Sequence, residues 1–408
     1  MVTTDLRVRT LSRLEEALAL RAEWEALYER SSRASGAQSY PFVTTAWELA
    51  ERRQRGQVVL VVATVADELV CVAPFWLQKE GPILVAGTLG SGSREEYAEP
   101  LLAKRPDAAL IAAKVLERAT SLADVLRLTN IPSSSPFVAA VDRSRQFVHR
   151  STTQSPVVSL RGAASWEEWL ASKSSKFRRR NRYEWNRLAK AGELTTSYGA
   201  TPSEARAIVD WVFDTKVGWL ADRSISHSWL LDDHGRELFR TLSATPELSG
   251  CVSLVALQVD GRFVAASVGL RSRDRLEGLV TSYDPGFAAY TPGLVLVQAA
   301  VKDAYENRLD FDFRLTTDEY KMRWADRVDE HASLDIACSP RGLWYVTRLR
   351  LRHGGRSARR RAQAISRAAC PQGYAAARGG DYAAVPRQVG RDVGQHLQRL
   401  RSSLRRRS

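Results

Sequence analysis

Residues 281–324 read TSYDPGFAAYTPGLVLVQAAVKDAYENRLDFDFRLTTDEYKMRW, and their order decides the fold. Apolar and small residues alternate over 276–283, which predicts a strand, and 284–286 (Asp-Pro-Gly) end it. An apolar helix is predicted from 292 to about 305, followed by a short strand at 310–313. Two strands joined through a helix in this way place the helix start beside the end of the first strand.

The predicted helix begins with Pro292 and Gly293. Proline fits the first helical turn because its missing N–H group would be unpaired there anyway. A helix that starts on glycine offers bare backbone N–H groups and the positive end of the helix dipole, which can hold a pyrophosphate or a developing oxyanion. The alternative is a loop followed by an ordinary core helix.

Several short motifs in this stretch fit one family pattern: Tyr283-Asp284, Tyr290-Thr291-Pro292-Gly293, Asp312-Phe313, Tyr320-Lys321 and Trp324. Together they resemble the acyltransferase module of the CelD/BcsL-like branch (BioF2-like acetyltransferase domain) of the GNAT superfamily, which is similar to the Fem aminoacyltransferases. The resemblance covers about residues 1–340. Thr316 stands where the family usually has glycine, and the loss of easy access to positive φ predicts an acceptor side that differs from the family norm.

Acyl transfer to an amine needs a group that accepts the amine proton, a donor for the developing oxyanion and a proton for the leaving group. On the family motif, Asp312 or Asp284 would accept the amine proton, and Tyr320 or Tyr283 would protonate the leaving group. Lys321 would pair with phosphate or stabilise the oxyanion. No Ser-His-Asp or Cys-His arrangement is evident, so direct attack is expected rather than a covalent acyl-enzyme. The structural alternatives are a solvated strand edge for the aspartates and a surface ion pair for the lysine.

The resemblance implies acyl-CoA as co-substrate. We expect it to be bound by Tyr290, Pro292 and Gly293 at the helix start and by Arg179 and Arg180 upstream. The two arginines belong to a basic helix at Lys173–Lys190, in which eight Lys and Arg residues face one acid. A helix of one charge sign repels itself and requires an anionic partner. That partner is a CoA phosphate, a tRNA backbone, a phosphorylated sugar lipid or an acidic face of the other domain.

The rest of the chain repeats one pattern of elements twice. Two helices, a hairpin, a strand, a helix and a strand occur in each half, with hairpin turns at Ala66-Asp67 and Asp260-Gly261. The predicted fold class is therefore α/β, with two tandem GNAT-like domains of mixed sheets flanked by helices and a basic C-terminal tail. The predicted limits are 1–150 for a degenerate N-terminal domain without the Pro-Gly helix start, 151–346 for the acyltransferase domain and 347–408 for the Arg-rich tail, partly disordered or helical. Three aromatic residues of the first domain are either cleft wall or ordinary core: Trp47, Phe75 and Trp76.

The net charge of +14 is confined to the tail. Residues 347–408 contain 16 Arg and only two acids, Asp381 and Asp392, so the rest of the chain, with 44 basic and 44 acidic residues, is neutral. The tail and the basic helix are candidates for binding tRNA or an anionic surface, and a merely solubilising tail is the alternative.

Cysteine and histidine spacing argues against metal chemistry. Cys71, Cys251, Cys338 and Cys370 are far apart, the six histidines are scattered, and no metal site is expected. The apolar runs are too short to span a bilayer. We expect reduced thiols and a cytoplasmic protein, with peripheral attachment at the inner membrane as a further option.

These observations predict an N-acyltransferase that moves an acyl group, acetyl in the first instance, from acyl-CoA to an amine of an amino sugar or related small metabolite. Polysaccharide or cell-envelope biosynthesis is the expected setting. The first alternative is a Fem-like transferase that uses aminoacyl-tRNA to form a peptide bond. The second is a non-catalytic scaffold of polysaccharide synthesis or export, in which Thr316 marks a decayed site.

Overall fold

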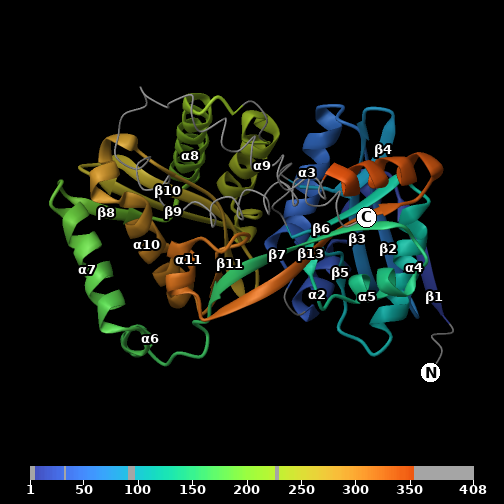
Figure 1. Cartoon of the computed structure of the whole chain (residues 1–408), viewed down its shortest axis with the longest axis horizontal. Coiled ribbons are helices and arrows are strands. Elements are labelled where there is room, and N and C mark those ends of the chain that lie inside the picture. The colour runs from blue at the N-terminus through green and yellow to red at the C-terminus, as the bar shows by residue number, and fades with distance from the viewer. Residues whose placement is uncertain (1–4, 32–33, 91–96, 226–228, 353–408) are drawn as a thin grey trace, which may run out of the picture. The chain divides into compact units, whose positions relative to one another are not determined.

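The computed structural model describes residues 5–31, 34–90, 97–225 and 229–352. They form one mixed sheet with the strand order β1-β2-β3-β4-β6-β13-β7-β12-β11-β10-β9-β8, and β5 pairs with β3. Helices cover both faces of this sheet (Figure 1). The predicted mixed α/β fold is therefore confirmed.

The first half contains these elements: β1 (Leu6–Leu11), α1 (Leu14–Leu18), α2 (Arg21–Arg30), η1 (Gly36–Gln38), α3 (Tyr40–Arg52), β2 (Gln57–Val65), β3 (Glu68–Glu80), β4 (Ile83–Thr88), β5 (Leu101–Leu102), α4 (Ala108–Thr120), β6 (Val125–Pro132) and α5 (Pro136–Arg143). Helix α5 follows β6 after a short turn. Ser135 caps it by accepting a hydrogen bond from the Phe137 N–H, and Pro136 occupies its first turn.

The second half contains the following: β7 (Val148–Val158), α6 (Trp166–Ser172), α7 (Ser175–Ala189), β8 (Leu194–Ser197), α8 (Pro202–Asp222), η2 (Trp229–Leu231), α9 (Asp233–Ala244), η3 (Ser249–Cys251), β9 (Val252–Val259), β10 (Arg262–Arg271), β11 (Arg275–Tyr283), η4 (Pro285–Tyr290), α10 (Pro292–Glu306), β12 (Asp310–Asp312), α11 (Glu319–Trp324) and β13 (Arg327–Ala337). The basic helix predicted at Lys173–Lys190 is α7. It is separate from α6, because the chain turns at Lys173 and Ser174 caps α7.

The tandem arrangement is visible in the strand pairing. In each half a hairpin is followed by a strand that lies antiparallel to it, and a helix then crosses to a parallel strand: β2, β3, β4, α4 and β6, and β9, β10, β11, α10 and β12. Both predicted hairpin turns have positive φ, at Ala66 and Asp67 in the first and at Asp260 and Gly261 in the second. Such turns match the twist of the strands they join.

Two strands join the halves across the predicted boundary. The limit at residue 150 falls inside β7, and β13, the last strand of the chain, lies between β6 and β7. The halves therefore share a continuous sheet. The predicted start of the tail at residue 347 also falls inside a helical segment, because residues 340–348 are helical and bury Val346 against Ile83, Val85 and Val125.

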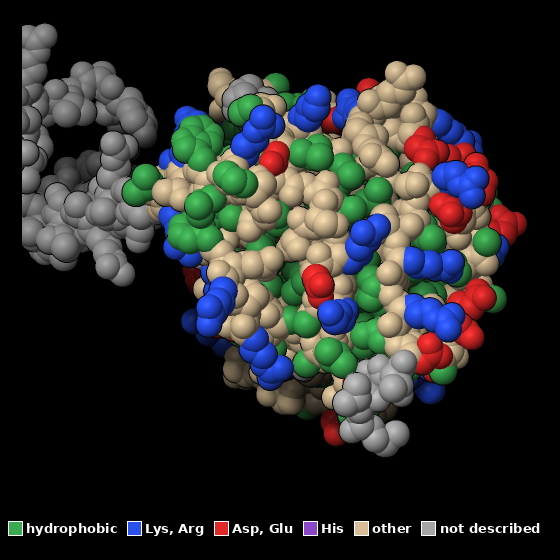
Figure 2. Space-filling model, turned by 90° about the vertical axis from the view of Figure 1, so that its right-hand side faces the viewer, with side chains coloured by type: hydrophobic (Ala, Val, Ile, Leu, Met, Phe, Trp, Pro, Cys, Tyr) green, Lys and Arg blue, Asp and Glu red, His purple; other side chains and the backbone are tan. Residues whose placement is uncertain are grey.

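The chain divides into two compact units, Met1–Arg348 and Leu349–Ser408. In the second unit, described residues 349–352 are helical, and the remaining Arg-rich tail from residue 353 lies outside the described residues. On the face of the first half that Figure 2 shows, Lys and Arg side chains lie beside Asp and Glu, in keeping with a core of balanced charge.

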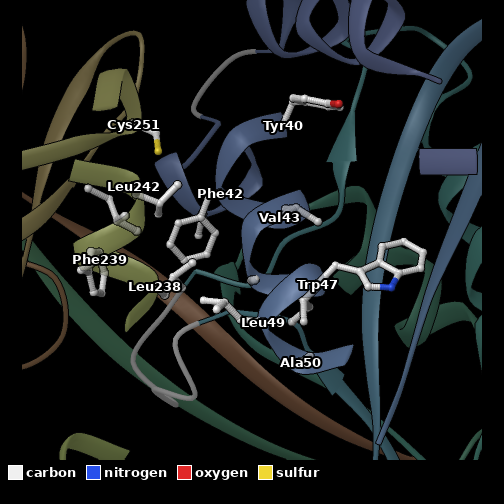
Figure 3. Packing of buried hydrophobic residues seen from close by; sticks show 14 of the residues in the cluster. Tyr40, Phe42, Val43, Trp47, Leu49, Ala50, Leu238, Phe239, Leu242 and Cys251 are labelled. Atoms are coloured by element: carbon white, nitrogen blue, oxygen red, sulfur yellow. The ribbon is translucent and has the colours of Figure 1, made fainter. Parts of the chain in front are cut away.

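A hydrophobic core connects the two halves on one side of the sheet. Helices α2 and α3 pack there together with α8 and α9. Figure 3 shows Phe42 of α3 pointing toward Leu238, Phe239 and Leu242 of α9, and the Phe42 and Phe239 ring centroids are 6.4 Å apart. The opposite side carries separate clusters beneath α4 and α5 and beneath α10. Trp47, Phe75 and Trp76 are all buried in these cores.

Within the described residues, no helix is long and apolar enough to cross a membrane. The same residues contain no group of three or more His, Cys, Asp or Glu side chains placed to hold a metal ion. Cys71, Cys251 and Cys338 are free thiols, and Cys370 lies outside the described residues.

Candidate active site

Helix α10 starts beside the end of β11, as the sequence predicted. Pro292 is its first residue, and Thr291 precedes it with a left-handed backbone (φ 52°) that turns the chain sharply from η4 into the helix. The Leu294 N–H bonds to the Thr291 carbonyl at 3.0 Å. The first turn of such a helix presents N–H groups and positive potential to whatever lies in front of it.

A cavity of about 530 Å³ opens at this helix start. It is bounded by α10, by the faces of β9, β10 and β11 that α10 covers, and by α11. Its lining includes these candidates from the sequence: Tyr283, Pro292, Gly293, Tyr320 and Lys321. The structure therefore brings residues from three separate motifs around one space.

The backbone of β10 and β11 is closely packed at the floor of this cavity. The strand register shifts between Val268 and Gly269, and Gly269 lies opposite Gly278. A Cβ atom at Gly269 would lie 2.4 Å from the Glu277 carbonyl oxygen. Only glycine fits at position 269, and the irregularity it permits lies beside Glu277.

Glu277 is a cavity-lining residue that the sequence interpretation missed. Its carboxylate Oε2 accepts hydrogen bonds from the Ser35 hydroxyl (2.8 Å) and from Arg314 (3.2 Å), while Oε1 has a longer contact of 3.4 Å with the Gly36 N–H. Burial raises the pKa of Glu277, and the positive charges of Arg314 and Arg275 oppose this effect. A buried acid within an otherwise apolar strand was the available sequence signal.

Asp312, the predicted proton acceptor, does not line the cavity. It is fully buried at the end of β12, where both carboxylate oxygens lie 3.0 Å from the Tyr97 hydroxyl. Ser155 of β7 and the Arg314 N–H (2.7 Å) donate to it as well, and Arg275 lies 3.4 Å away. With its oxygens occupied by four donors, Asp312 ties β12 to β7 and β11 beneath the cavity.

Asp312, Glu277, Arg275 and Arg314 form a buried polar cluster with balanced charge. Tyr97 covers it: the Arg314 guanidinium lies 4.5 Å from the centre of the Tyr97 ring, and His331 stacks on the ring at 4.5 Å. Burial, followed by the negative charge of Asp312, raises the pKa of Tyr97 well above its ordinary value. The cluster thus holds Glu277 in a dry, charge-paired setting.

Lys321 is buried and supports the loop after β12. Its Nζ donates to the Phe313 and Leu315 carbonyls and to the Thr316 hydroxyl, at 3.2, 2.6 and 3.0 Å. Thr316 has φ 79°, so this chain keeps the left-handed backbone that glycine would adopt easily. The Thr316 hydroxyl also donates to Asp318 at 2.6 Å. These bonds hold the positive-φ backbone of Thr316, at the position where the family usually has glycine.

The two predicted proton donors, Tyr283 and Tyr320, lie at the cavity, whereas Asp284 does not line it. Tyr320 and Tyr283 line the cavity and are partly exposed, and burial raises the pKa of Tyr320, with a smaller contribution from Asp318. Asp284 instead caps η4 by accepting a hydrogen bond from the Gly286 N–H at 2.8 Å. Tyr290 packs on Phe287, with ring centroids 6.0 Å apart.

The basic helix α7 packs against α10 next to the cavity. A second hollow of about 370 Å³ lies between α7 and α11 and shares Leu294 and Tyr320 with the first. Arg180 lines this hollow and pairs with Glu184 at 2.7 Å, whereas Arg179 is exposed on the helix surface. Lys176 and Arg323 contribute further positive charge to the hollow.

Two further side chains lie at or near the cavity, Lys216 and Trp324. Lys216 of α8 lines the cavity and donates to the Thr281 carbonyl at 3.1 Å; the sequence interpretation missed it. Trp324 is buried and stacks on Trp169, with centroids 5.9 Å apart, while Phe177 meets it edge-on at 4.8 Å. This aromatic cluster anchors α11 beneath α7.

The comparison with family models places these elements within a known module. Residues 175–322, which contain α7, the cavity and most of α11, match the model of the acetyltransferase (GNAT) domain. The chain carries a GNAT-type acetyltransferase domain. This match confirms the resemblance to the GNAT superfamily and the acyltransferase class predicted from the sequence.

Solved structures extend the likeness in fold beyond the acetyltransferase domain. FemX matches with a TM-score of 0.54 and 10% identity, over 80% of this chain and 96% of its own. A conserved protein of unknown function from Bacteroides thetaiotaomicron matches with 0.51 and 14%, over 78% and 97%. The C-terminal domain of a protein described as a lysylphosphatidylglycerol synthetase, from Agrobacterium fabrum, matches with 0.50 and 12%, over 80% and 92%. The search of curated proteins gave no match.

Proposed function

We propose that the protein transfers an acyl group from acyl-CoA to the amine of a small metabolite such as an amino sugar. The observation that carries the proposal is the cavity at the first turn of α10, which Tyr283, Gly293 and Tyr320 line together and at whose floor the backbone of Glu277 lies. The helix start offers backbone N–H groups and positive charge to a pyrophosphate, and the two tyrosines offer proton donors.

The donor would lie along β11. Its phosphates would meet the start of α10 at Gly293, next to Lys176 of the adjoining hollow, in which Arg180 and Arg323 are paired with Glu184 and Glu319. Its thioester would lie near Gly278, where the strand irregularity leaves room. Arg179, on the exposed surface, would contribute only long-range attraction.

The reaction needs a neutral amine and two proton transfers. As the amine nitrogen bonds to the thioester carbon, a water molecule relays the amine proton to Glu277, whose side chain is buried behind the cavity floor. The C–S bond then breaks, and Tyr320 protonates the leaving thiolate. The raised pKa of Tyr320 keeps its hydroxyl protonated at neutral pH, as a proton donor requires. Tyr283 is the second candidate for this role because it lines the same cavity.

The ordered loop at Thr316 favours a working site over a decayed scaffold. Lys321 and Asp318 both bond the Thr316 hydroxyl, so the loop is held without the family's glycine. Placement in polysaccharide or cell-envelope biosynthesis, in the cytoplasm or at the inner membrane surface, is part of the proposal and follows from the family resemblance.

The direct test is a transfer assay. The full-length protein is incubated with acetyl-CoA and a panel of amino sugars and other primary amines, and free thiol and product mass are followed. Amide formation that depends on both substrates is expected for at least one amine. Absence of CoA binding together with absence of thiol release would contradict the proposal.

A second candidate function draws on the exposed cations of α7. Lys176, Arg179 and Arg182 lie on its surface next to the hollow, where the end of an aminoacyl-tRNA would enter. If tRNA is the donor, gel-shift titration will show tight binding that weakens steeply as salt rises, because counterion release dominates phosphate binding. A separate titration with CoA will then show no measurable affinity. The acyl-CoA proposal predicts the reverse.

A further inference from the structure

The cavity extends sideways across the sheet, away from the path that leads to Glu277. Gly278 of β11 lies opposite Gly269 of β10, and Gly269 lies opposite Ser253 of β9. All three residues line the cavity. Small residues in one cross-strand row leave a trough between the sheet and the helix that covers it.

The walls of this trough are mainly apolar. Leu296 and Ala300 of α10 cover it, and Val255 and Leu276 line its sides. The charged side chains among the described residues that line the cavity are Lys216, Glu277 and Lys321. Lys216 and Lys321 come from α8 and α11, and Glu277 lies at the β11 end of the row. The end at Ser253 therefore presents methyl groups and hydroxyls rather than charge.

The length of this row of small residues limits the length of the group that can lie in the trough. Adjacent strands are about 4.8 Å apart, so the distance from β11 to β9 is on the order of 10 Å, the length of about eight extended carbons. An acetyl group would end at the first residue of the row.

We propose that the preferred donor is a medium-chain acyl-CoA of about six to eight carbons, with its acyl tail lying over Gly278 and Gly269 and ending at Ser253. This inference rests on the proposed function and specifies its donor. Ser253 sets the chain length, because its small side chain leaves the far end open, and the small side chain of Ser267, on β10 two residues before Gly269, keeps the middle of the trough wide. Each methylene buried in the trough should raise affinity about fourfold, from its transfer free energy.

The test is a titration series with CoA, acetyl-CoA, hexanoyl-CoA, octanoyl-CoA and palmitoyl-CoA on the full-length protein. We expect octanoyl-CoA to bind at least about 100-fold more tightly than acetyl-CoA, with no further gain for palmitoyl-CoA. In Ser253→Leu, the affinity ratio of octanoyl-CoA to acetyl-CoA should fall toward one, because leucine fills the end of the trough. Ser267→Val is a second variant with the same expected direction, and melting curves verify that both are folded.

Thr195→Leu is the matched control. It places the same side chain at an exposed position of the neighbouring strand β8 and should keep the wild-type ratio. If acetyl-CoA binds but longer chains add no affinity, or if both folded variants keep the ratio, the chain-length inference is overturned and the acyltransferase proposal stands. If neither CoA nor any acyl-CoA binds, the proposed function itself fails, and this inference fails with it.

Discussion

At the scale of single residues, the site depends on which carboxylate reaches the cavity. The sequence motif pointed to Asp312, but its oxygens are occupied by Tyr97, Ser155 and Arg314 below the cavity. Glu277 borders the cavity and keeps one oxygen with only a long contact. On the proposed function, Asp312 supports the structure and Glu277 is the final acceptor of the amine proton.

Glu277→Gln should lower turnover at least about 100-fold, the scale of losing a positioned base. CoA affinity should stay near that of the wild type. A base works when deprotonated, so wild-type activity should rise with pH through the Glu277 pKa, which burial places above the ordinary range of a carboxyl group. This loss of activity at low pH, the acidic limb of the pH profile, should be absent from Glu277→Gln. A pH profile of kcat with the limb intact in Glu277→Gln would assign the proton acceptor to another group.

Lys321→Met should destabilise the protein by about 2 kcal/mol, because the loop after β12 loses charge-assisted bonds to two carbonyls and a hydroxyl. Lys302→Met is the matched control. Lys302 is exposed and paired only with Glu306, so its loss should change the free energy of unfolding by less than about 0.5 kcal/mol. Urea unfolding curves compare them. Equal effects in the two variants would show that the Lys321 bonds do not hold the loop.

At the scale of elements, the short strand β12 is held in the sheet by side chains as well as by its backbone. Asp312 connects β12 to Ser155 of β7 and to Arg275 of β11. A catalytic role alone predicts that Asp312→Asn changes turnover with little change in melting temperature. The observed contacts predict destabilisation of about 3 kcal/mol or more, since the buried cluster would lose one of its two negative charges while it keeps both arginines.

Thermal unfolding of Asp312→Asn distinguishes these roles. Asp222→Asn serves as the control, because its side chain is exposed at the C-terminal end of α8. An unchanged melting temperature in Asp312→Asn would contradict the supporting role.

The elements that could be predicted from the sequence are those with strong local signals. Hairpin turns at Ala66-Asp67 and Asp260-Gly261 and the proline at the start of α10 identified most of the central framework. Strands β7 and β13 were missed because much of each is polar and exposed, and their places in the sheet depend on pairing between residues far apart in sequence. The motifs of the candidate site are local and could be read from the sequence, whereas Tyr97, which contacts Asp312, and Ser35, which contacts Glu277, come from the other half of the chain.

At the scale of the whole molecule, the two halves form one folding unit. They share the sheet through β7 and β13, and α3 packs on α9. Phe42→Ala, in the half without the cavity, should cost about 3–5 kcal/mol and shift the unfolding of both halves together. Hydrogen exchange read separately in β3 and β10 tests this expectation. Lower protection confined to the first half would indicate two independent domains.

The central claim is that the start of α10 binds the phosphates of a CoA donor, and calorimetric titration of CoA tests it most directly. A Cβ at Gly293 would meet the Tyr283 ring at 3.8 Å, an ordinary contact, so Gly293→Val should fold while its side chain enters the cavity. The control Gly218→Val lies on α8 with open space around its Cβ. We predict micromolar CoA binding to the wild type and the control, weakened at least about tenfold, or about 1.4 kcal/mol, in Gly293→Val. Equal CoA affinity in all three folded proteins, or none in the wild type, would contradict the claim.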